Sequence, residues 1–424
     1  MATNRLDSAF LAPEERQAIS VQRAAELRDK IAGYLAAESE IMTGRNMADP
    51  IAAVKERLLH MLGSSEANWV DWHWQLRKRI SSMSLLVELM DLDQRQLLEI
   101  EKVSRKYRWA ISPYYATLVV AGGLGGPGWL QGVPSPLELR DTIGVADPMN
   151  EALTSPAPGI TRRYPDRLII NVTNQCAMYC RHCQRRRNIG EIDKHQPRRV
   201  LEQALAYIRA SPEIRDVLVT GGDALLLSDE QLDWLLGELY SIEHVEIKRL
   251  GTRTIVTMPQ RITAELCSVL AKYPPIYINT QFNHPLEVTA EAAQASDRLI
   301  QAGVILGNQT VLLRGVNNDP HVMKKLNQEL LRIRVRPYYL FHAKQVQGTG
   351  HFITSIDEGQ AIIEHLRGQT SGLAVPEYIV NAPGGYGKIP IGPSYILERT
   401  RSKFVIRTWE NRIFSYANHP RSHR

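Results

Sequence analysis

The stretch Cys176-Ala177-Met178-Tyr179-Cys180-Arg181-His182-Cys183 decides how the rest of the chain is interpreted. It holds three of the chain's four cysteines, with three and then two residues between them. Thiolates at this spacing can bind one small inorganic centre, because a short loop turns several sulfurs inward on one point. A cubane of four irons held in this way would keep one iron without a protein ligand. That iron is a position where a further molecule can bind.

The main alternative for this stretch is a zinc knuckle completed by His182, or reduced structural cysteines. Zinc sites usually draw their ligands from two separated pairs, whereas His182 lies between two of these cysteines and the chain offers no second pair. A zinc centre next to Arg185-Arg186-Arg187, acting as a phosphate patch, would suit a nucleic-acid-binding protein. The spacing favours an iron–sulfur cluster, and the zinc-containing nucleic-acid binder stays as a remote alternative.

The composition favours a globular protein with more than one module. A length of 424 residues leaves room for a barrel of roughly 200 to 250 residues and an added module. Lysine plus arginine exceed the acids by 51 to 45, an excess that suits small anions better than nucleic acid. No stretch approaches the roughly 20 apolar residues of a membrane span, and Met1 to Asp7 lacks a signal peptide's apolar core. With the clustered cysteines, this predicts a cytoplasmic protein without a membrane or nucleic-acid partner.

Residues 1 to about 110 are predicted to be helices joined by short polar segments. Apolar residues recur at intervals of three and four in Pro13 to Leu35 and in Asp49 to Leu62, and Asp91-Leu92-Asp93 marks a helix start near Gln94. Three tryptophans between these helices anchor either a packed core or a subunit contact, and core packing is favoured. They are Trp69, Trp72 and Trp74.

A glycine-rich segment, Ala121 to Gly128, matches the pattern G-x-G-x-x-G from Gly123 onward. A dinucleotide site would need a helix immediately afterwards. Residues 129–136 contain one glycine and two prolines, so we expect a flexible loop here. The proline-rich joint Ser155 to Pro165 then closes the first module.

From Arg167 onward, short β-branched runs alternate with amphipathic segments. This order predicts parallel strands with right-handed crossovers, in a barrel or a doubly wound sheet. The cysteine stretch and a later glycine pair each follow a strand's carboxyl end, where barrel active sites lie. The predicted strands are Leu168 to Val172, Val217 to Thr220, Val245 to Leu250, Ile276 to Thr280, Gly307 to Leu312 and Val335 to Phe341; the predicted helices are Arg199 to Ala210, Asp229 to Ser241, Ala264 to Lys272, Ala290 to Ala302 and His321 to Ile333.

Two further glycine-rich segments carry candidate chemistry. In Thr220-Gly221-Gly222-Asp223, paired glycines let the backbone come close to a ligand. Pro383 to Lys388 is no phosphate-binding P-loop, because Ala382 stands at the first glycine position and Ile389 replaces the required Ser or Thr. A lysine that follows such a turn can react with the carbonyl of a cofactor, although a surface turn would look the same.

Taken together, these motifs resemble the lysine 2,3-aminomutase family of radical S-adenosylmethionine enzymes, which also use pyridoxal 5′-phosphate. The resemblance runs from about Trp69 to Phe414, through RYPDR, CRHCQRRR, VLVTGGDALL, MPQRIT, FNHP, LGNQTVLLRGVN, RVRPYYL, LRGQTSG and NAPGGYGK. It implies an α/β fold in which a partial (β/α)6 radical S-adenosylmethionine barrel with the pyridoxal phosphate site spans residues 156–395. A helical oligomerisation and lid module is expected at 1–155, and a short extension at 396–424.

The resemblance also assigns roles to individual residues. It implies a [4Fe–4S] cluster held by cysteines, a lysine that binds pyridoxal phosphate, and contacts to S-adenosylmethionine and to the substrate. The cluster ligands are Cys176, Cys180 and Cys183, the pyridoxal phosphate lysine is Lys388, the residues near its phosphate are Arg163 and Arg167, those that hold S-adenosylmethionine are Gly221, Gly222, Asp223 and Gln309, and Arg185 binds the substrate α-carboxylate.

The chain departs from lysine-specific members at two positions. Those members carry two aspartates that grip the substrate's side-chain ammonium, and the matching positions here are Lys344 and Asn381. A lysine beside an ammonium would cost several kcal/mol in a desolvated pocket, whereas a carboxylate there gains a charge-assisted hydrogen bond. The pair resembles the glutamate 2,3-aminomutase branch. Lysine 2,3-aminomutase remains the alternative, and aspartate stays open as a substrate.

The activity implied is that of an isomerase that interconverts L-α-glutamate and β-glutamate. A 5′-deoxyadenosyl radical would drive a 1,2-shift of the amino group while pyridoxal phosphate holds the nitrogen. Some relatives also hold structural zinc with cysteines near the C-terminus, but residues 414–424 contain none, so no structural zinc is expected. A reducing electron donor such as flavodoxin or ferredoxin and a homo-oligomer are the expected partners.

Overall fold

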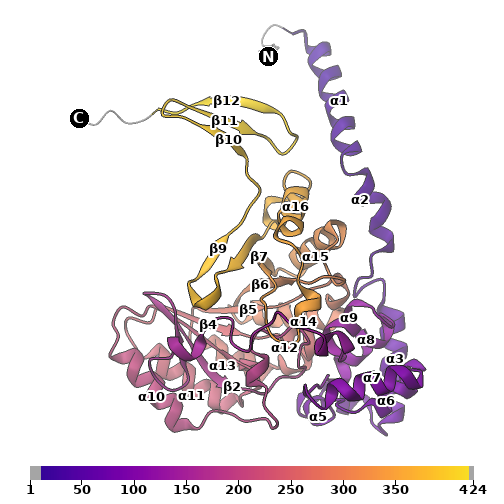
Figure 1. Ribbon diagram of the computed structural model, residues 1–424, viewed down its shortest axis with the longest axis vertical. Helices are drawn as coiled ribbons and strands as arrows, with labels where there is room; N and C mark the ends of the chain where they lie inside the picture. Colours follow the sequence, from indigo (N-terminus) through magenta and orange to yellow (C-terminus); the bar gives the residue numbers. More distant parts are fainter. Residues whose placement is uncertain (1–10, 420–424) are drawn as a thin grey trace. The chain divides into compact units, whose positions relative to one another are not determined.

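The computed structural model describes residues 11–419, which form two compact units with a boundary between Ile41 and Met42 (Figure 1). The first unit contains α1 (Pro13–Asp29), α2 (Ala32–Ala37) and a 3-10 turn, η2 (Glu38–Glu40). Pro13 at the first helical position and acidic Glu14 and Glu15 in the first turn suit the start of α1. The helix predicted from Pro13 is confirmed, with an interruption after Asp29.

The second unit begins with helices that pack their apolar sides into the core. The predicted start at Gln94 is confirmed, because the Asp93 side chain caps α7 by accepting a hydrogen bond from the Gln96 amide at 2.8 Å. Trp69 and Trp74 are buried in the core, as expected, whereas Trp72 is half-buried and stacks on His73. The helices are α3 (Ala48–Met61), α4 (Glu66–Val70), α5 (Trp72–Arg77), α6 (Met83–Met90), α7 (Gln94–Ser104), α8 (Pro113–Ala121) and α9 (Pro127–Gly132).

The glycine-rich segment is only partly a loop. Residues 122–126 connect two helices, but α9 begins at Pro127, so the expectation of a flexible loop through this whole region is wrong. Proline lacks a backbone N–H, but at the first helical position that group would have no partner within the helix, so no hydrogen bond is lost. Its fixed φ also suits a helix start. The helix then ends at Gly132, before Pro134. The segment therefore joins two buried helices.

A nine-stranded sheet forms the body of the second unit, with strands in sequential order from β1 to β9. β2 to β8 are parallel, while β1 (Ile160–Arg162) and β9 (Lys388–Pro390) pair antiparallel at the two ends. A doubly wound sheet would reverse its strand order, so sequential order identifies an open barrel. The parallel strands are β2 (Arg167–Thr173), β3 (Asp216–Gly221), β4 (Ile247–Gly251), β5 (Ile276–Thr280), β6 (Ile305–Leu312), β7 (Arg336–His342) and β8 (Glu377–Asn381).

The predicted alternation of strands and helices is confirmed. All six predicted strands form, as β2 to β7, and β8 adds a parallel strand that the sequence did not predict. Each predicted helix lies within one residue of its expected ends. The connecting helices are α10 (Arg198–Arg209), α11 (Asp229–Tyr240), α12 (Thr254–Thr257), α13 (Ala264–Ala271), α14 (Ala290–Gln301), α15 (Pro320–Arg332) and α16 (Ile356–Leu366).

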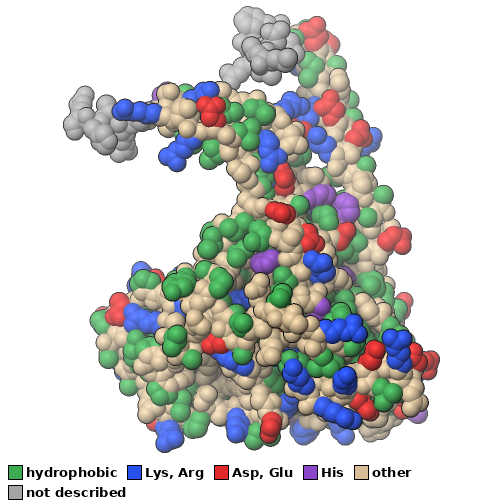
Figure 2. Space-filling view, in the orientation of Figure 1, with side chains coloured by type: hydrophobic (Ala, Val, Ile, Leu, Met, Phe, Trp, Pro, Cys, Tyr) green, Lys and Arg blue, Asp and Glu red, His purple; other side chains and the backbone are tan. Residues whose placement is uncertain are grey.

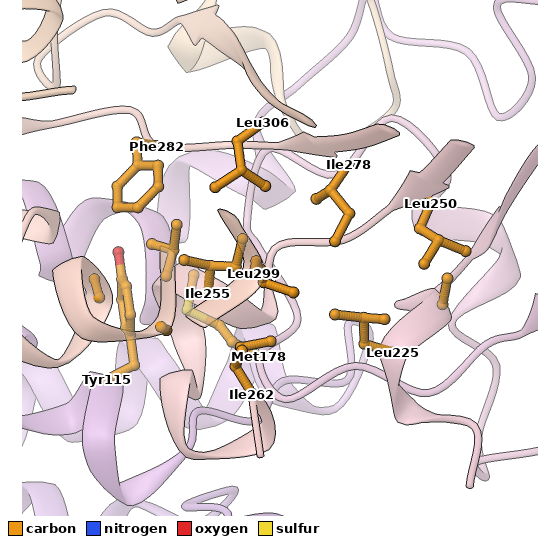
Figure 3. Packing of buried hydrophobic residues seen from close by; sticks show 14 of the residues in the cluster. Tyr115, Met178, Leu225, Leu250, Ile255, Ile262, Ile278, Phe282, Leu299 and Leu306 are labelled. Atoms are coloured by element: carbon orange, nitrogen blue, oxygen red, sulfur yellow. The ribbon is translucent and has the colours of Figure 1, made fainter. Parts of the chain in front are cut away.

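Apolar side chains fill the space between the strands and the surrounding helices. Figure 3 shows Leu250, Ile278 and Leu306, from β4, β5 and β6, among the residues of one buried cluster. Met178 of the cysteine stretch belongs to the same cluster and is 2% exposed. Burial of such a side chain stabilises the fold by about 1.5 to 3 kcal/mol. The core thus anchors the loop that carries the cysteines.

The C-terminal residues form a separate antiparallel sheet within the second unit. It consists of β10 (Ile396–Arg399), β11 (Lys403–Arg407) and β12 (Ile413–Ala417), in that order. None of the helices in residues 11–419 combines the length and apolar character that crossing a membrane requires. On the face drawn in Figure 2, lysine and arginine side chains are interspersed with acidic ones, so the excess positive charge is not gathered there into one patch.

Candidate active site

A cavity of about 310 Å³ opens at the carboxyl ends of the parallel strands. Its wall includes the last residues of several strands, among them Gly221, Gly251 and Asn381. Every residue to which the family resemblance gives a role lines this cavity, although these residues lie up to 225 positions apart in the chain, from Arg163 to Lys388. They are Arg163, Arg167, Cys176, Cys180, Cys183, Arg185, Gly221, Gly222, Asp223, Gln309, Lys344, Asn381 and Lys388.

The cysteine loop, residues 176–183, follows β2 directly and carries free thiols. Burial raises the pKa of the Cys176 thiol, and nearby Asp223 adds to this effect; burial also raises the pKa of Cys183. The Arg253 guanidinium donates a hydrogen bond to the Cys180 sulfur at 2.8 Å. This contact places a buried guanidinium beside one of the three predicted cluster ligands. Arg253 escaped the sequence analysis, because its place beside Cys180 depends on the folded loop after β4.

The surroundings of His182 bear on the zinc alternative for this loop. In the part of the chain that the structure describes, no three histidine, cysteine or acidic side chains converge on one ion position. His182, the proposed fourth zinc ligand, has its Nε2 within 3.0 Å of the Gln281 side-chain amide and 3.3 Å of that of Asn283. That nitrogen accepts hydrogen bonds from protein amides.

Several buried polar atoms in the cavity wall lack a partner within residues 11–419, which is the mark of a site built for a polar ligand. Burial holds the pKa of His182 well below its usual range, so the neutral ring carries its proton on Nδ1 when Nε2 accepts. The buried polar atoms of the cavity wall that lack a partner are Arg163 Nε, His182 Nδ1, Asn279 Nδ2, Thr280 Oγ1 and Asn381 Nδ2. These groups fit the phosphate, carboxylate and ribose oxygens of cofactors and substrate.

The glycine pair after β3 brings that loop against the start of the cysteine loop. A Cβ on Gly222 would lie 2.3 Å from the Gln175 carbonyl oxygen, so only glycine fits here. The amide of Asp223 donates to the same carbonyl at 2.8 Å. The Asp223 carboxylate accepts hydrogen bonds from Thr252 Oγ1 at 2.6 Å and the Arg253 amide at 2.7 Å. Because the Asp223 carboxylate already forms these hydrogen bonds within the protein, residues 221–223 would contact a ligand through their backbone groups.

Lys388 begins β9, directly after the glycine-rich turn, and pairs with Asn381 of β8. Gly385 of this turn has φ +84°, and a Cβ there would lie 2.7 Å from the Met149 carbonyl oxygen. The Lys388 amine lies 5.5 Å from the ring centre of Tyr164 and 5.7 Å from that of Tyr339. Burial and neighbouring arginines, first Arg167, lower the pKa of Lys388 to about 8. The aromatic rings and the lowered pKa favour a reactive amine.

Lys344 and Asn381 line the same cavity as Lys388. The Lys344 amine donates a hydrogen bond to the Gln184 side chain and lies 5.5 Å from the ring centre of Phe341. Burial, followed by the charges of Arg185 and Lys388, lowers the pKa of Lys344 to about 7. An anion bound beside Lys344 would offset these charges and stabilise the protonated amine.

Glu151 is the main residue that the sequence did not reveal. It begins η4 (Glu151–Thr154) and is bound by Arg163 at 2.8 Å, Arg185 at 3.1 Å and Arg187 at 2.8 Å. These arginines keep its pKa low despite burial. Arg185 uses Nε for this contact, which orients its guanidinium in the cavity wall. Nothing local marks Glu151, because its partners come from other segments.

Comparison with known proteins identifies the class to which this fold and this cysteine loop belong. A family model for the radical SAM superfamily matches residues 170–326, which include the cysteine loop and β2 to β6. The protein is therefore a radical S-adenosylmethionine enzyme. A second family model, described as lysine-2,3-aminomutase, matches residues 363–423.

Curated relatives match nearly the whole chain. Glutamate 2,3-aminomutase from Clostridioides difficile is 51% identical over 406 residues, 96% of each chain. L-lysine 2,3-aminomutase from Clostridium subterminale is 46% identical over 354 residues, 83% of this chain and 85% of the relative. The enzyme of the same name from Methanococcus maripaludis is 47% identical over 353 residues, 82% of each chain. The chain belongs to the lysine 2,3-aminomutase family.

Membership of this family settles the general chemistry. The protein is an isomerase that uses a [4Fe–4S] cluster, S-adenosylmethionine and pyridoxal 5′-phosphate. It also requires an amino acid substrate and a reductant. The zinc-containing nucleic-acid binder is ruled out as the class of function.

Proposed function

We propose that the protein is a glutamate 2,3-aminomutase, which interconverts L-α-glutamate and β-glutamate. The observation that carries the proposal is Lys344, a lysine with its amine in the wall of the cavity that also contains Lys388 and Arg185. The relative from Clostridioides difficile, which has this name and is 51% identical, supports the same substrate. L-lysine 2,3-aminomutases at 46% and 47% identity represent the alternative.

We assign the cofactors to the residues of the cavity by their chemistry. Cys176, Cys180 and Cys183 would hold the cluster, and Lys388 would bind pyridoxal phosphate. Bound together, the cofactors supply radical chemistry that removes and returns a hydrogen atom, and a carbonyl that carries the migrating nitrogen. Arg163 and Arg167 suit the phosphate, while Gly221, Gly222, Asp223 and Gln309 suit S-adenosylmethionine.

Lys388 is prepared for attack on a carbonyl by its lowered pKa. With a pKa of about 8, roughly one amine in ten carries no proton at pH 7. An ordinary lysine would hold its proton in all but about one molecule in 3,000. The ring centres of Tyr164 and Tyr339 lie 5.5 Å and 5.7 Å from this amine, and Tyr164 also lines the cavity.

Arg185 would bind the substrate α-carboxylate with the part of its guanidinium that Glu151 leaves open. Glu151 accepts hydrogen bonds from Arg185 Nε, and no described residue accepts one from its Nη groups. The rigid plane of the guanidinium then points two donors in a fixed direction, which suits a bidentate carboxylate. Glu151 acts as a positioning residue in this arrangement.

Lys344 would distinguish an acidic side chain from a basic one. A substrate carboxylate beside it forms a charge-assisted hydrogen bond and raises its pKa from about 7 toward the ordinary value. A substrate ammonium would meet the charges of Lys344 and Arg185, while the nearby acid, Glu151, is already bound by three arginines. The Asn381 side-chain amide, buried without a partner in the described chain, can donate to the same carboxylate.

An anaerobic competition assay tests the substrate. Reconstituted protein is incubated with cofactors, dithionite and equal L-glutamate, L-aspartate and L-lysine, and the products are separated by chiral chromatography. β-Glutamate is expected to dominate, and the double variant Lys344→Asp with Asn381→Asp should shift the product toward β-lysine. β-Lysine from the unchanged protein would overturn the proposal.

We also propose the finer features of organisation that the sequence predicted. A homo-oligomer is supported by exposed apolar side chains on the C-terminal sheet, such as Ile413, Phe414 and Tyr416. The clustered thiols support a cytoplasmic location. The division at residues 155 and 395 remains our proposal for the lid, barrel and extension. Light scattering of an Ile413→Lys and Tyr416→Lys variant tests the oligomer: loss of assembly is expected, and an unchanged mass would contradict it.

A further inference from the structure

A second cavity, of about 800 Å³, adjoins the cysteine loop. Seven of its lining side chains are arginine or lysine, and one, Glu191, is acidic. We call it the basic cavity, and its lining includes Arg79, Arg105, Lys106 and Arg108. Ile189 and Val346 line both this cavity and the active-site cavity. The two cavities are therefore neighbours.

The basic cavity reaches the backbone of the cysteine loop directly. Arg79 donates hydrogen bonds to the Cys176 carbonyl at 2.7 Å and to the Tyr179 hydroxyl at 3.3 Å. The guanidinium groups of Arg79 and Arg108 lie 5.6 Å and 4.8 Å from the ring centre of Tyr179. Tyr179 immediately precedes Cys180. A partner bound in this cavity would lie next to the cluster ligands without entering the cavity for substrate and cofactors.

The charges of the basic cavity differ between its floor and its rim. The floor is formed by half-buried side chains such as Arg79 and Arg108, which both bind Asp193, at 2.5 Å and 2.9 Å. At the rim, Arg105 and Lys106 are exposed, and among residues 11–419 neither forms an ion pair. One carboxylate thus offsets part of the charge of two arginines on the floor, while the rim offers positive charge to an acidic partner. A small anion in the floor would have to compete with Asp193.

We propose that the basic cavity is the docking surface for an acidic one-electron carrier protein that reduces the cluster. The inference rests on the proposed cluster at Cys176, Cys180 and Cys183 and names the partner that the radical chemistry requires. One electron leaves the carrier and one electron is added to the cluster, so the step needs no further reactant. Redox encounters use small interfaces steered by opposite charges, which suits an exposed basic rim around a concave surface.

The test compares two variants with the same change of charge. Arg105→Glu with Lys106→Glu reverses the rim, whereas Arg199→Glu with Arg336→Glu changes exposed residues that lie outside both cavities. An acidic flavodoxin is titrated into each reconstituted protein at low and high ionic strength, and binding is followed by flavin fluorescence. Cluster reduction by reduced flavodoxin and by dithionite is then timed by stopped-flow absorbance.

The rim variant should bind flavodoxin about tenfold more weakly at low ionic strength and be reduced more slowly by it. Salt should diminish the difference, because it screens exposed charges. Dithionite reduction should be unchanged, and the control variant should match the wild type. Equal flavodoxin binding by both variants would overturn the proposal. It would also be overturned if inorganic pyrophosphate bound tightly and stoichiometrically, and the rim variant lost this binding but not that of flavodoxin.

Failure of the substrate assignment remains distinguishable from failure of this inference. Neither flavodoxin binding nor cluster reduction involves the amino acid, so both can be measured if glutamate is not converted. If no cluster can be reconstituted, the proposed chemistry fails. The titration with cluster-free protein still reports on the surface, since the rim charges belong to the polypeptide.

Discussion

The active-site cavity and the basic cavity contain similar side chains in different states of exposure. In the active-site cavity, burial lowers the pKa of Lys344 to about 7 and that of Lys388 to about 8. In the basic cavity, Arg105 and Lys106 are exposed. A buried amine has a pKa that changes when a charged ligand binds beside it. An exposed cation instead attracts partners over a longer distance, and salt screens that attraction. The difference explains why the two cavities suit different partners.

The largest expected effect comes from removing the buried amine that the chemistry needs. Lys388→Ala should abolish the pyridoxal label that borohydride fixes to the protein and reduce β-glutamate formation roughly a thousandfold or more, because Lys388 is the amine to which we assign the cofactor. Mass spectrometry of tryptic peptides measures the label. Lys102→Ala, at an exposed position on α7, is the control. An undiminished label in the Lys388 variant would refute the assignment.

A second effect tests whether the charge of Lys344 acts on the substrate at short range, where salt does not screen it. Lys344→Met keeps the length of the side chain but removes the charge, so the KM for glutamate should rise roughly 10- to 100-fold, as expected for losing a hydrogen bond between charged groups. Initial rates at 50 and 300 mM salt measure KM. Because the group is buried, the ratio of variant to wild type should change little with salt. Lys102→Met should leave KM unchanged, and an equal KM for Lys344→Met would contradict the role.

A smaller effect is expected from the carboxylate that positions Arg185. Glu151→Gln weakens contacts to Arg163, Arg185 and Arg187, so KM should rise about tenfold and stability fall by about 1 to 3 kcal/mol. Glu213→Gln is the matched control, because Glu213 pairs with Arg162 at an exposed site. Loss of an exposed pair costs less than about 1 kcal/mol. Urea unfolding and initial rates measure both quantities, and equal effects of the two substitutions would remove the positioning role.

The regular part of the fold could be predicted because its signals are local. Each strand from β2 to β7 is a short β-branched run between amphipathic helices, and each formed where expected. β8 and β9 were missed because they are short and flank a glycine-rich turn. β10 to β12 were missed because their side chains are partly or fully exposed on both faces, which weakens the alternation that marks a half-buried strand.

The candidate site likewise contains some residues that could be predicted from the sequence and others that could not. Cysteine spacing predicted the cluster loop, whereas the role of Lys388 was predicted from the family resemblance, because its glycine-rich turn alone could equally be a surface turn. Glu151 and Arg253 could not be found, because their meaning arises from contacts with residues 34 and 73 positions away, Arg185 and Cys180. The roles given to the predicted residues remain predictions, since co-location in one cavity does not assign a function to each side chain.

The smallest expected effect is on stability, and it distinguishes buried Lys344 from exposed Lys106. The Lys344 amine has an ordinary pKa of 10.5 in the unfolded chain and a pKa of about 7 in the folded protein. Between these values the unfolded state binds more protons, so the free energy of unfolding of ligand-free protein should rise with pH across this window. Below pH 7 both states are protonated, and the folded state bears the full cost of a buried charge.

Lys344→Met carries no such charge. It should therefore unfold at a temperature roughly a few degrees above that of the wild type at pH 6, and the advantage should shrink as the pH rises toward 10. Circular dichroism melts of ligand-free protein at pH 6, 7.5 and 9 measure the trend. Lys106→Met at the exposed rim should show a difference independent of pH, because its amine stays in water in both states. If both variants gave the same flat profile, the pKa of Lys344 would not be lowered in the ligand-free protein, and burial would not separate the two cavities.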